Sequence, residues 1–241
     1  IDSANSGTAA SGRAPTTGGA NGHDTAALPG VDEVIACSDV STVAGASAIT
    51  IFGCFNAPGS QTNVFATIIG KLFGGVEFHV GGSFGGTRLV ASVGSDFGLG
   101  SEATSDVNVF DGTWHRFIFT WVGGGFGTLY IDGVAQSAVT AVTDGSVPNA
   151  SEFLSMGGVT DDNTTNFDYF FDGDIANVGI AIREAVGAEI TDLDDYLADW
   201  VNAAATSDLA GSAAGVATTT ASIVGTGTLT SVAAAGVATT T

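Results

Sequence analysis

The chain has 241 residues, and 25 aspartates and glutamates outnumber five lysines and arginines, which gives a formal net charge of −20. Such a surface repels nucleic-acid phosphates and anionic lipid head groups, so neither nucleic acid nor a membrane is an expected partner. The chain also lacks an apolar run of the roughly 18 residues that would span a bilayer, and its 36 glycines and few helix-forming residues favour strands and turns.

Residues 1–30 form an N-terminal arm rich in Gly, Ala, Ser and Thr, with little periodicity. Such a composition cannot bury enough apolar surface to fold alone. We therefore expect the arm to be held by the surface of its own domain or by neighbouring chains, and the second case would indicate an assembly.

Residues 31–187 carry the pattern of an antiparallel sandwich, with short β-prone runs separated by Gly, Asp and Asn. The predicted strands are Val34–Cys37, Ala48–Phe55, Val64–Phe73, Val76–Val80, Leu89–Val93, Val107–Phe110, Trp114–Trp121, Leu129–Ile131 and Val178–Ile182. Apolar residues on both faces predict a central position for Ala48–Phe55. In Val76–Val80, Glu77 and His79 alternate with apolar residues, which predicts a strand that is half buried.

The segment 111–134 is the most informative part of the sequence. It reads DGTWHRFIFTWV, then a glycine-rich gap, then LYIDGV. Phe117, Phe119 and Trp121 fall on one face of the first strand because side chains alternate along a strand. Asp132 and Gly133 supply the positive φ angles that a two-residue hairpin requires.

The period changes over residues 188–204, which predicts an amphipathic helix that covers an edge of the sandwich or contacts a partner. The apolar stripe of this helix is expected to contain Leu193, Tyr196, Leu197, Trp200 and Val201. Thr191 and Asp194 resemble a capping box at its start.

Residues 205–241 form a tail that contains the octapeptide AAGVATTT twice, at 213–220 and 234–241, with a period of 21 residues. Repeats of this kind cannot bury a core singly and gain stability by stacking on neighbours. A flexible tail is the alternative interpretation.

Three segments together resemble the laminin-G-like, concanavalin-type jelly-roll family. The segment 111–134 resembles the family's WH strand and LYxDG hairpin, and 48–58 resembles an early strand with Gly53 and Cys54 in place of the usual aromatic residue. The segment 171–180 resembles the closing strand, and the AEI that follows at 188–190 is common in the family. The resemblance implies an all-β fold, an antiparallel β-sandwich jelly roll. With the helix and the repeats described above, the predicted chain is this jelly roll with one C-terminal helix and a β-prone repeat tail.

No catalytic, cofactor-binding or metal site is predicted, and the protein is not expected to be an enzyme. Glycosidases of this fold need two carboxylates near the scissile bond, but their usual E-x-D-x-x-E motif is absent, since Glu77 has no carboxylate at 79 or 81. In relatives the positions of Trp114, His115 and Arg116 are mostly architectural, so we expect packing and local hydrogen bonds there. His23 and His79 have no obvious partners in the sequence.

Three features leave alternatives open. Cys37 and Cys54 are either small buried hydrophobes or a disulfide. The acidic region 161–174 is favoured as a solvated loop over a calcium site. The aromatic run Phe167, Tyr169, Phe170 and Phe171 is favoured as packing over a sugar-stacking surface. The acidic region consists of Asp161, Asp162, Asn163, Asp168, Asp172 and Asp174.

The leading prediction is a non-catalytic structural or decoration protein of an extracellular assembly, a capsid or tail protein of a phage virion. Its partners would be other copies of itself or other virion subunits, bound through the arm and the repeats by strand addition. The alternative is a glycan- or cell-surface-binding module of a secreted bacterial adhesin, which predicts an exposed aromatic platform. Both predictions place the protein on a virion surface or outside the cell, without a cofactor other than calcium as a candidate.

Overall fold

The computed structural model describes residues 8–9, 25–30, 34–37, 43–59, 61, 63, 65–71, 77–83, 86–94, 102–137, 145–148, 153–160 and 167–201. The chain divides into two units, Ile1–Asn202 and Ala203–Thr241, and every described residue belongs to the first. Most of the arm 1–30 and the whole tail 205–241 lie outside the described residues, so their proposed roles in assembly stay predictions.

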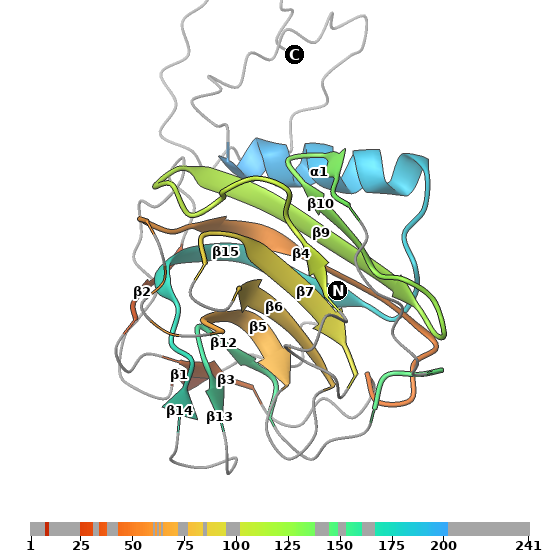
Figure 1. The fold of residues 1–241 in the computed structure, drawn as a ribbon, viewed down its shortest axis with the longest axis horizontal. Coiled ribbons are helices and arrows are strands. Elements are labelled where there is room, and N and C mark those ends of the chain that lie inside the picture. Colours follow the sequence, from red (N-terminus) through yellow and green to blue (C-terminus); the bar gives the residue numbers. More distant parts are fainter. Residues whose placement is uncertain are drawn as a thin grey trace, which may run out of the picture. The chain divides into compact units, whose positions relative to one another are not determined.

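Two antiparallel sheets face each other (Figure 1). The seven-stranded sheet has the order β1-β3-β12-β5-β6-β7-β8 and consists of β1 (Thr8–Ala9), β3 (Ile35–Ala36), β5 (Thr67–Lys71), β6 (Phe78–Gly82), β7 (Leu89–Val93), β8 (Ala103–Thr104) and β12 (Ser155–Met156). The six-stranded sheet has the order β11-β10-β9-β4-β15-β2 and consists of β2 (Ala26–Pro29), β4 (Ala48–Asn56), β9 (Trp114–Val122), β10 (Thr128–Ile131), β11 (Val134–Ala135) and β15 (Asp172–Ala181). A separate pair contains β13 (Val159–Thr160) and β14 (Phe167–Asp168). This arrangement confirms the predicted all-β sandwich.

The core lies between the sheets, because every second side chain of a strand points to the same face. Phe117, Phe119 and Trp121 of β9 are at most 1% exposed and pack in this core, which confirms the face predicted for them. Each apolar side chain buried in this way stabilises the fold by roughly 1.5–3 kcal/mol relative to exposure.

The central strand β4 explains why the family's aromatic residue is missing from this chain. A Cβ atom at Gly53 would lie 2.9 Å from Val178 Cγ2 and 3.0 Å from the Phe117 ring, so a larger side chain would force these neighbours to move. Cys54 faces the other side of the sheet and is fully buried there. As predicted, β4 lies inside its sheet, between β9 and β15.

The helix α1 (Ala188–Val201) lies across the outer face of the six-stranded sheet (Figure 1). It buries Ile190 and Leu197 against Cys54 and Ile118. The sheet is therefore covered by apolar side chains on both faces. The predicted helix is confirmed over these residues, and no helix in the described part of the chain is long and apolar enough to cross a membrane.

The predicted capping box is wrong. The helix begins at Ala188, so Thr191 lies inside it. The Asp194 carboxylate is instead bound by Arg116 of β9. Thr191 and Asp194 therefore do not cap the helix, and Asp194 instead connects α1 to the sheet through Arg116.

The prediction of a half-buried strand at Glu77 and His79 is also wrong, because both side chains are fully buried. Lys71 Nζ lies 2.9 Å from Glu77 Oε1, and neither side chain is exposed. Burial lowers the pKa of His79 to about 3, although a hydrogen bond with the backbone of Phe65 opposes this shift, so the imidazole is neutral. Alternation of polar and apolar residues cannot distinguish a solvated face from one that buries its polar groups.

Two other predictions concern short segments. Val107–Phe110 is not a strand, and the short strand that precedes β9 is β8. Val109 and Phe110 lie in a loop, and their side chains are buried. Cys37 and Cys54 are free and buried. Cys37 follows β3 of the seven-stranded sheet, and Cys54 lies in β4 of the six-stranded sheet. Burial raises the pKa of both thiols, and that of Cys54 reaches about 12.

Candidate functional site

A pocket of about 380 Å³ lies between the first half of α1, the end of β15 and β4. Its size falls within the range of roughly 300–1,000 Å³ that is usual for small-molecule sites. The lining residues are Thr50, Phe52, Ala181, Arg183, Ala185, Glu189, Asp192, Leu193 and Tyr196.

Two aromatic side chains form apolar walls of the pocket. Phe52 lies against β15, where a Cβ atom at Gly179 would overlap its ring. The side chain of Tyr196 is 44% exposed although it belongs to the predicted apolar stripe of α1. Tyr196 is therefore accessible to solvent where it lines the pocket.

The Tyr196 hydroxyl contacts a β-bulge in β15. The register between β15 and β4 shifts between Ala176 and Gly179, and Asn177 in this bulge has a φ of 50°. Asn is one of the residues that tolerate such a conformation, and a bulge redirects the side chains of its strand. Tyr196 donates its hydroxyl hydrogen to Asn177 Oδ1 at 3.2 Å.

The charged part of the lining is an ion pair. Arg183 Nη1 donates to Glu189 Oε2 at 2.7 Å, and the Val186 amide donates to the same oxygen at 3.2 Å. The hydrogen bond between the two side chains lowers the pKa of Glu189 and raises that of Arg183, so both are charged at neutral pH. An exposed pair of this kind adds little stability, but it holds both groups at the pocket.

Thr50 positions the segment that connects β15 to α1. Its buried hydroxyl donates to the Arg183 carbonyl at 2.7 Å and accepts from the Ala185 amide at 2.9 Å. The connection is therefore attached to the central strand β4, and the pocket is bounded by backbone that is hydrogen-bonded in place.

The lining combines ring faces with carboxylate and guanidinium groups, which suits a ligand that has both apolar and polar surfaces. Ile182 and Val186, which lie in the same connection, are 52% and 55% exposed. The lining residues named above include no histidine, cysteine or serine.

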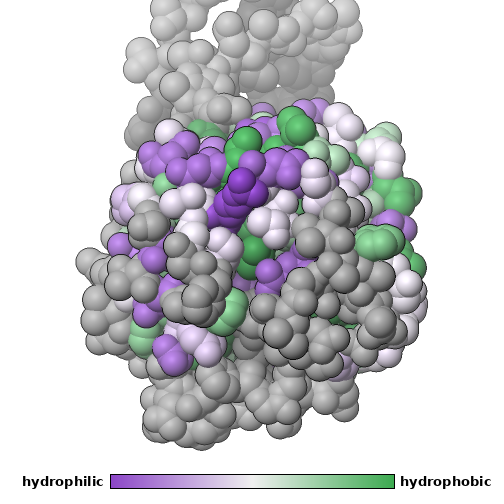
Figure 2. Space-filling model, viewed as in Figure 1, coloured by the Kyte–Doolittle hydropathy of each residue, from purple (hydrophilic) through white to green (hydrophobic). Residues whose placement is uncertain are grey.

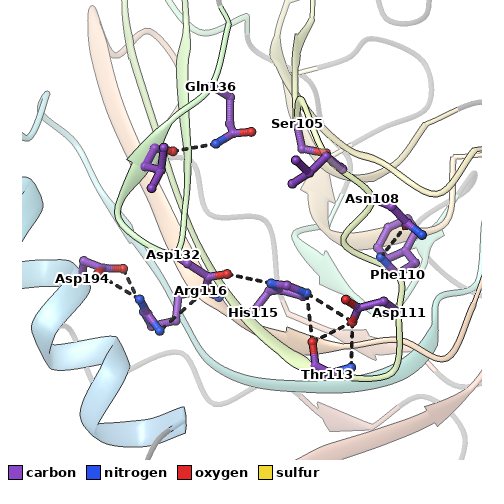
Figure 3. A network of polar contacts seen from close by, with 12 residues as sticks. Ser105, Asn108, Phe110, Asp111, Thr113, His115, Arg116, Asp132, Gln136 and Asp194 are labelled. Carbon is purple, nitrogen blue, oxygen red and sulfur yellow. Dashed lines mark hydrogen bonds and ion pairs between the residues drawn. The ribbon is translucent and has the colours of Figure 1, made fainter.

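The Trp-His-Arg segment forms a polar network that the sequence analysis expected to be architectural (Figure 3). His115 Nδ1 lies 2.7 Å from Asp132 Oδ2, and His115 Nε2 lies 3.2 Å from the Thr113 hydroxyl and 3.3 Å from Asp111 Oδ1. The hydrogen bond to Asp132 raises the pKa of His115, although burial opposes it. The network joins the start of β9 to the β10–β11 turn.

Arg116 extends the network to α1 (Figure 3). Its Nε and Nη2 atoms donate to the two carboxylate oxygens of Asp194 at 2.8 and 3.1 Å. Asp132 and Gly133 have φ angles of 50° and 80°, which confirms the predicted two-residue hairpin between β10 and β11. The prediction of local hydrogen bonds holds for His115, whose partners lie within 17 positions, but it is wrong for the Arg116 side chain, whose partner Asp194 is 78 positions away. Trp114 packs beneath α1.

The aromatic run is used for packing where its side chains are described. Phe171 is fully buried, with its ring centroid 6.4 Å from Phe55 and 6.3 Å from Phe110. The Tyr169 ring contacts Phe65 at 5.8 Å in an edge-on arrangement. Among the described residues, the exposed aromatic side chains are Phe126 at 56% and Tyr196 at 44%, and both lie outside the predicted run. Of these two, Tyr196 lines the pocket.

The acidic region lies partly outside the described residues, since Asp161, Asp162 and Asn163 fall there, as does His23. Among the residues that are described, no three His, Cys, Asp or Glu side chains are placed to hold a metal ion. The calcium candidate stays a prediction that depends on the undescribed part of the loop.

Sequence reasoning did not single out Thr50, Phe52, Arg183 or Glu189. These residues meet through contacts such as that between Thr50 and Arg183, which are 133 positions apart. No local motif contains both ends of such a contact. The tyrosine in the helical stripe was the one available signal, because a side chain with a polar tip suits the border of a buried face.

A comparison with curated proteins finds no match. Among solved structures, the chain is similar to the SAP-like pentraxin of Limulus polyphemus, with 12% identity, a TM-score of 0.52 and coverage of 70% of this chain and 81% of that one. It is also similar to domain 4 of AbnA, an extracellular arabinanase of Geobacillus stearothermophilus, with 20% identity, a TM-score of 0.52 and coverage of 78% and 82%. These likenesses support the fold. The family model of the concanavalin A-like lectin/glucanases superfamily (Laminin_G_3) matches residues 29–191, and since this match covers most of the chain, the protein belongs to that family.

Proposed function

We propose that this protein is a non-catalytic carbohydrate-binding module whose pocket beside α1 holds a glycan. The observation that carries the proposal is the Tyr196 ring, 44% exposed, at a pocket that is also lined by Arg183, Glu189 and Asp192. A sugar ring presents an apolar C–H face, which stacks on an aromatic ring, and hydroxyl groups, which hydrogen-bond to charged side chains.

Two further observations support this assignment. The family is named for lectins as well as glucanases, and domain 4 of AbnA was solved in complex with arabinotriose. The outer face of β6 and β7 is a poor alternative, because His79, Val90 and Ser92 on that face are at most 2% exposed.

We infer that the module acts outside the cell, where glycans are displayed, as in a secreted adhesin. The leading prediction from the sequence, a structural protein of a phage virion, depended on the arm 1–30 and the tail 205–241. Most of these residues lie outside the described part of the chain, and the relatives named above lend that role no support.

The proposal is tested with an array of plant, bacterial and animal oligosaccharides, followed by calorimetric titration of the best ligand. We expect Tyr196→Ala to weaken binding about tenfold, the equivalent of about 1.4 kcal/mol, because the stacking face is lost. Tyr196→Phe keeps the ring and is expected to retain most of the affinity. Since Tyr196 is exposed, its truncation is expected to leave Tm nearly unchanged.

Val134→Ala provides a matched control, because Val134 is 63% exposed on β11 at the edge of the same sheet and does not line the pocket. This variant is expected to bind like the wild type. Absence of binding to every glycan, or equal affinity of Tyr196→Ala and wild type, would show that the pocket is not a sugar site.

A further inference from the structure

We infer, on the basis of the proposed function, that the pocket selects uncharged, hydroxyl-rich oligosaccharides and excludes anionic ones such as uronates. The inference concerns the ligand class of the site and depends on how its charged side chains are paired. The family match does not distinguish between these two classes of sugar.

The first step concerns the positive charge of the pocket. Arg183 is the one cationic residue of the lining, and its guanidinium group is bonded to Glu189 at 2.7 Å. The same nitrogen donates to the Glu184 carbonyl at 3.3 Å. An incoming carboxylate that binds Arg183 would therefore lie beside the Glu189 carboxylate, which is a like charge.

The second step concerns the net charge. Glu189 and Asp192 both line the pocket, so the lining carries one positive and two negative groups. The whole chain has a formal net charge of −20. A negative site on a negative protein slows the association of anions and makes juxtaposed like charges costly.

The third step concerns what the same groups offer a neutral sugar. A carboxylate accepts hydrogen bonds and donates none, so Glu189 and Asp192 match the O–H donors of a polyol. Such charge-assisted hydrogen bonds are stronger than those between neutral groups. Phe52 and Tyr196, which also line the pocket, would contact the C–H faces of the sugar, as the proposed function requires.

The test uses a pair of trisaccharides that differ in charge, galactotriose and trigalacturonate, with full-length protein at low ionic strength. We expect the wild type to bind the neutral trisaccharide at least tenfold more tightly than the uronate. Glu189→Gln removes the anionic partner of Arg183 and is expected to shift the ratio of affinities at least tenfold toward the uronate.

Glu184→Gln is the matched control, since it removes the same charge one residue from Arg183. Glu184 does not line the pocket, and only its backbone carbonyl bonds Arg183, so its variant should keep the wild-type ratio. Asp192→Asn reduces the negative charge without touching the ion pair, and a smaller shift toward the uronate is expected. If Glu189→Gln does not fold, Asp192→Asn serves as the test in its place.

The outcomes separate the two proposals. Binding of a neutral glycan by the wild type, together with equal binding of its uronate counterpart or an unchanged ratio in Glu189→Gln, would overturn the ligand class and leave the module assignment intact. Failure of neutral and anionic sugars alike to bind would overturn both.

Discussion

His115 connects two segments through ionisable partners, so its contribution to folding depends on pH. The hydrogen bond to Asp132 raises its folded pKa above 6.5. Its stabilising effect is therefore fully present below pH 6.5 and is lost as the pH rises through the folded pKa. Burial raises the pKa of Asp132, but the hydrogen bonds from His115 and the Arg116 amide outweigh it and hold the value below 3.8, so its contribution is lost as the pH falls through that lowered pKa.

We predict that His115→Gln costs most stability between pH 3.8 and 6.5. The measurement is urea unfolding of variant and wild type across a pH series. The neighbouring charges that face the ring and its partner are Asp111, Asp132 and Arg116. A stability difference that stays constant from acid to alkaline pH would contradict this role.

Thr50 is predicted to stabilise both the fold and the pocket. Thr50→Val keeps the shape but leaves the Ala185 amide without its acceptor, which is expected to cost about 1–3 kcal/mol of unfolding free energy. Glycan affinity should fall in parallel because the connection from β15 to α1 loosens. Thr50→Ser retains the hydroxyl and serves as the control, and a Val variant as stable as the Ser variant would show that the two hydrogen bonds contribute nothing.

At this scale the sequence predicted the roles of residues whose partners are near in the chain. His115 and Asp132 lie close together because β9 and β10 are neighbouring strands, which agrees with the local hydrogen bonds that were predicted for His115. Arg183 and Phe52 gave no signal, because the pocket forms only when α1 folds onto the sheet. An exposed Tyr196 and a buried Leu197 are adjacent in sequence, and helix periodicity alone does not resolve that boundary.

Lys71 and Glu77 form a buried ion pair at the hairpin of β5 and β6. Its contribution to stability can be measured separately from that of the surrounding packing. Lys71→Met removes one partner and leaves the Glu77 carboxylate buried without its cation, which is expected to cost about 3–5 kcal/mol. The double variant Lys71→Met/Glu77→Leu removes both charges and is expected to recover most of that loss. Chemical denaturation of the two variants and the wild type measures the cycle, and a double variant less stable than the single one would contradict this account.

Elements with a sustained pattern were predicted well. Trp114–Val122 and Ala188–Val201 carry nine or more residues each, so their patterns extend far enough to be read from the sequence. In Asp172–Ala181 the alternation predicted only the end, Val178–Ile182, because the register shift between Ala176 and Gly179 interrupts it. Strands of two residues, such as β8 and β12, leave no periodic signal. Their pairing is set by the rest of the sheet, as when Ser155 pairs with Ala36 on one side and Gly70 on the other.

For the whole molecule, the excess of acidic residues predicts a stability that depends on salt. The formal charge of −20 opposes compaction through self-repulsion. Raising NaCl from about 10 to about 150 mM shortens the Debye length from about 30 to about 8 Å, so Tm is expected to rise. KCl at the same ionic strength should raise Tm as much as NaCl does. A Tm that falls or stays constant with added salt would show that self-repulsion does not lower the stability measurably.

The sandwich class was predictable because strand-like runs recur throughout residues 31–187, and the family resemblance located its hairpin and closing strand. The order of strands within each sheet was not predictable, since it depends on pairings between distant segments. Polar and apolar residues lie side by side at the edge of the molecule where α1 runs (Figure 2).

The placement of β4 beneath α1 and the pocket has a consequence for how this chain tolerates change. Ile49, Ile51 and Phe55 point into the core, while Phe52 and Cys54 point to the pocket and the helix. An ordinary surface strand accepts substitutions at every second position, where its side chains face solvent. In a library of random substitutions selected for sugar binding, β4 would not show this alternation. One set of its positions would fail by unfolding and the other by losing the ligand, so this strand would drift more slowly in evolution than any edge strand of the same sheet.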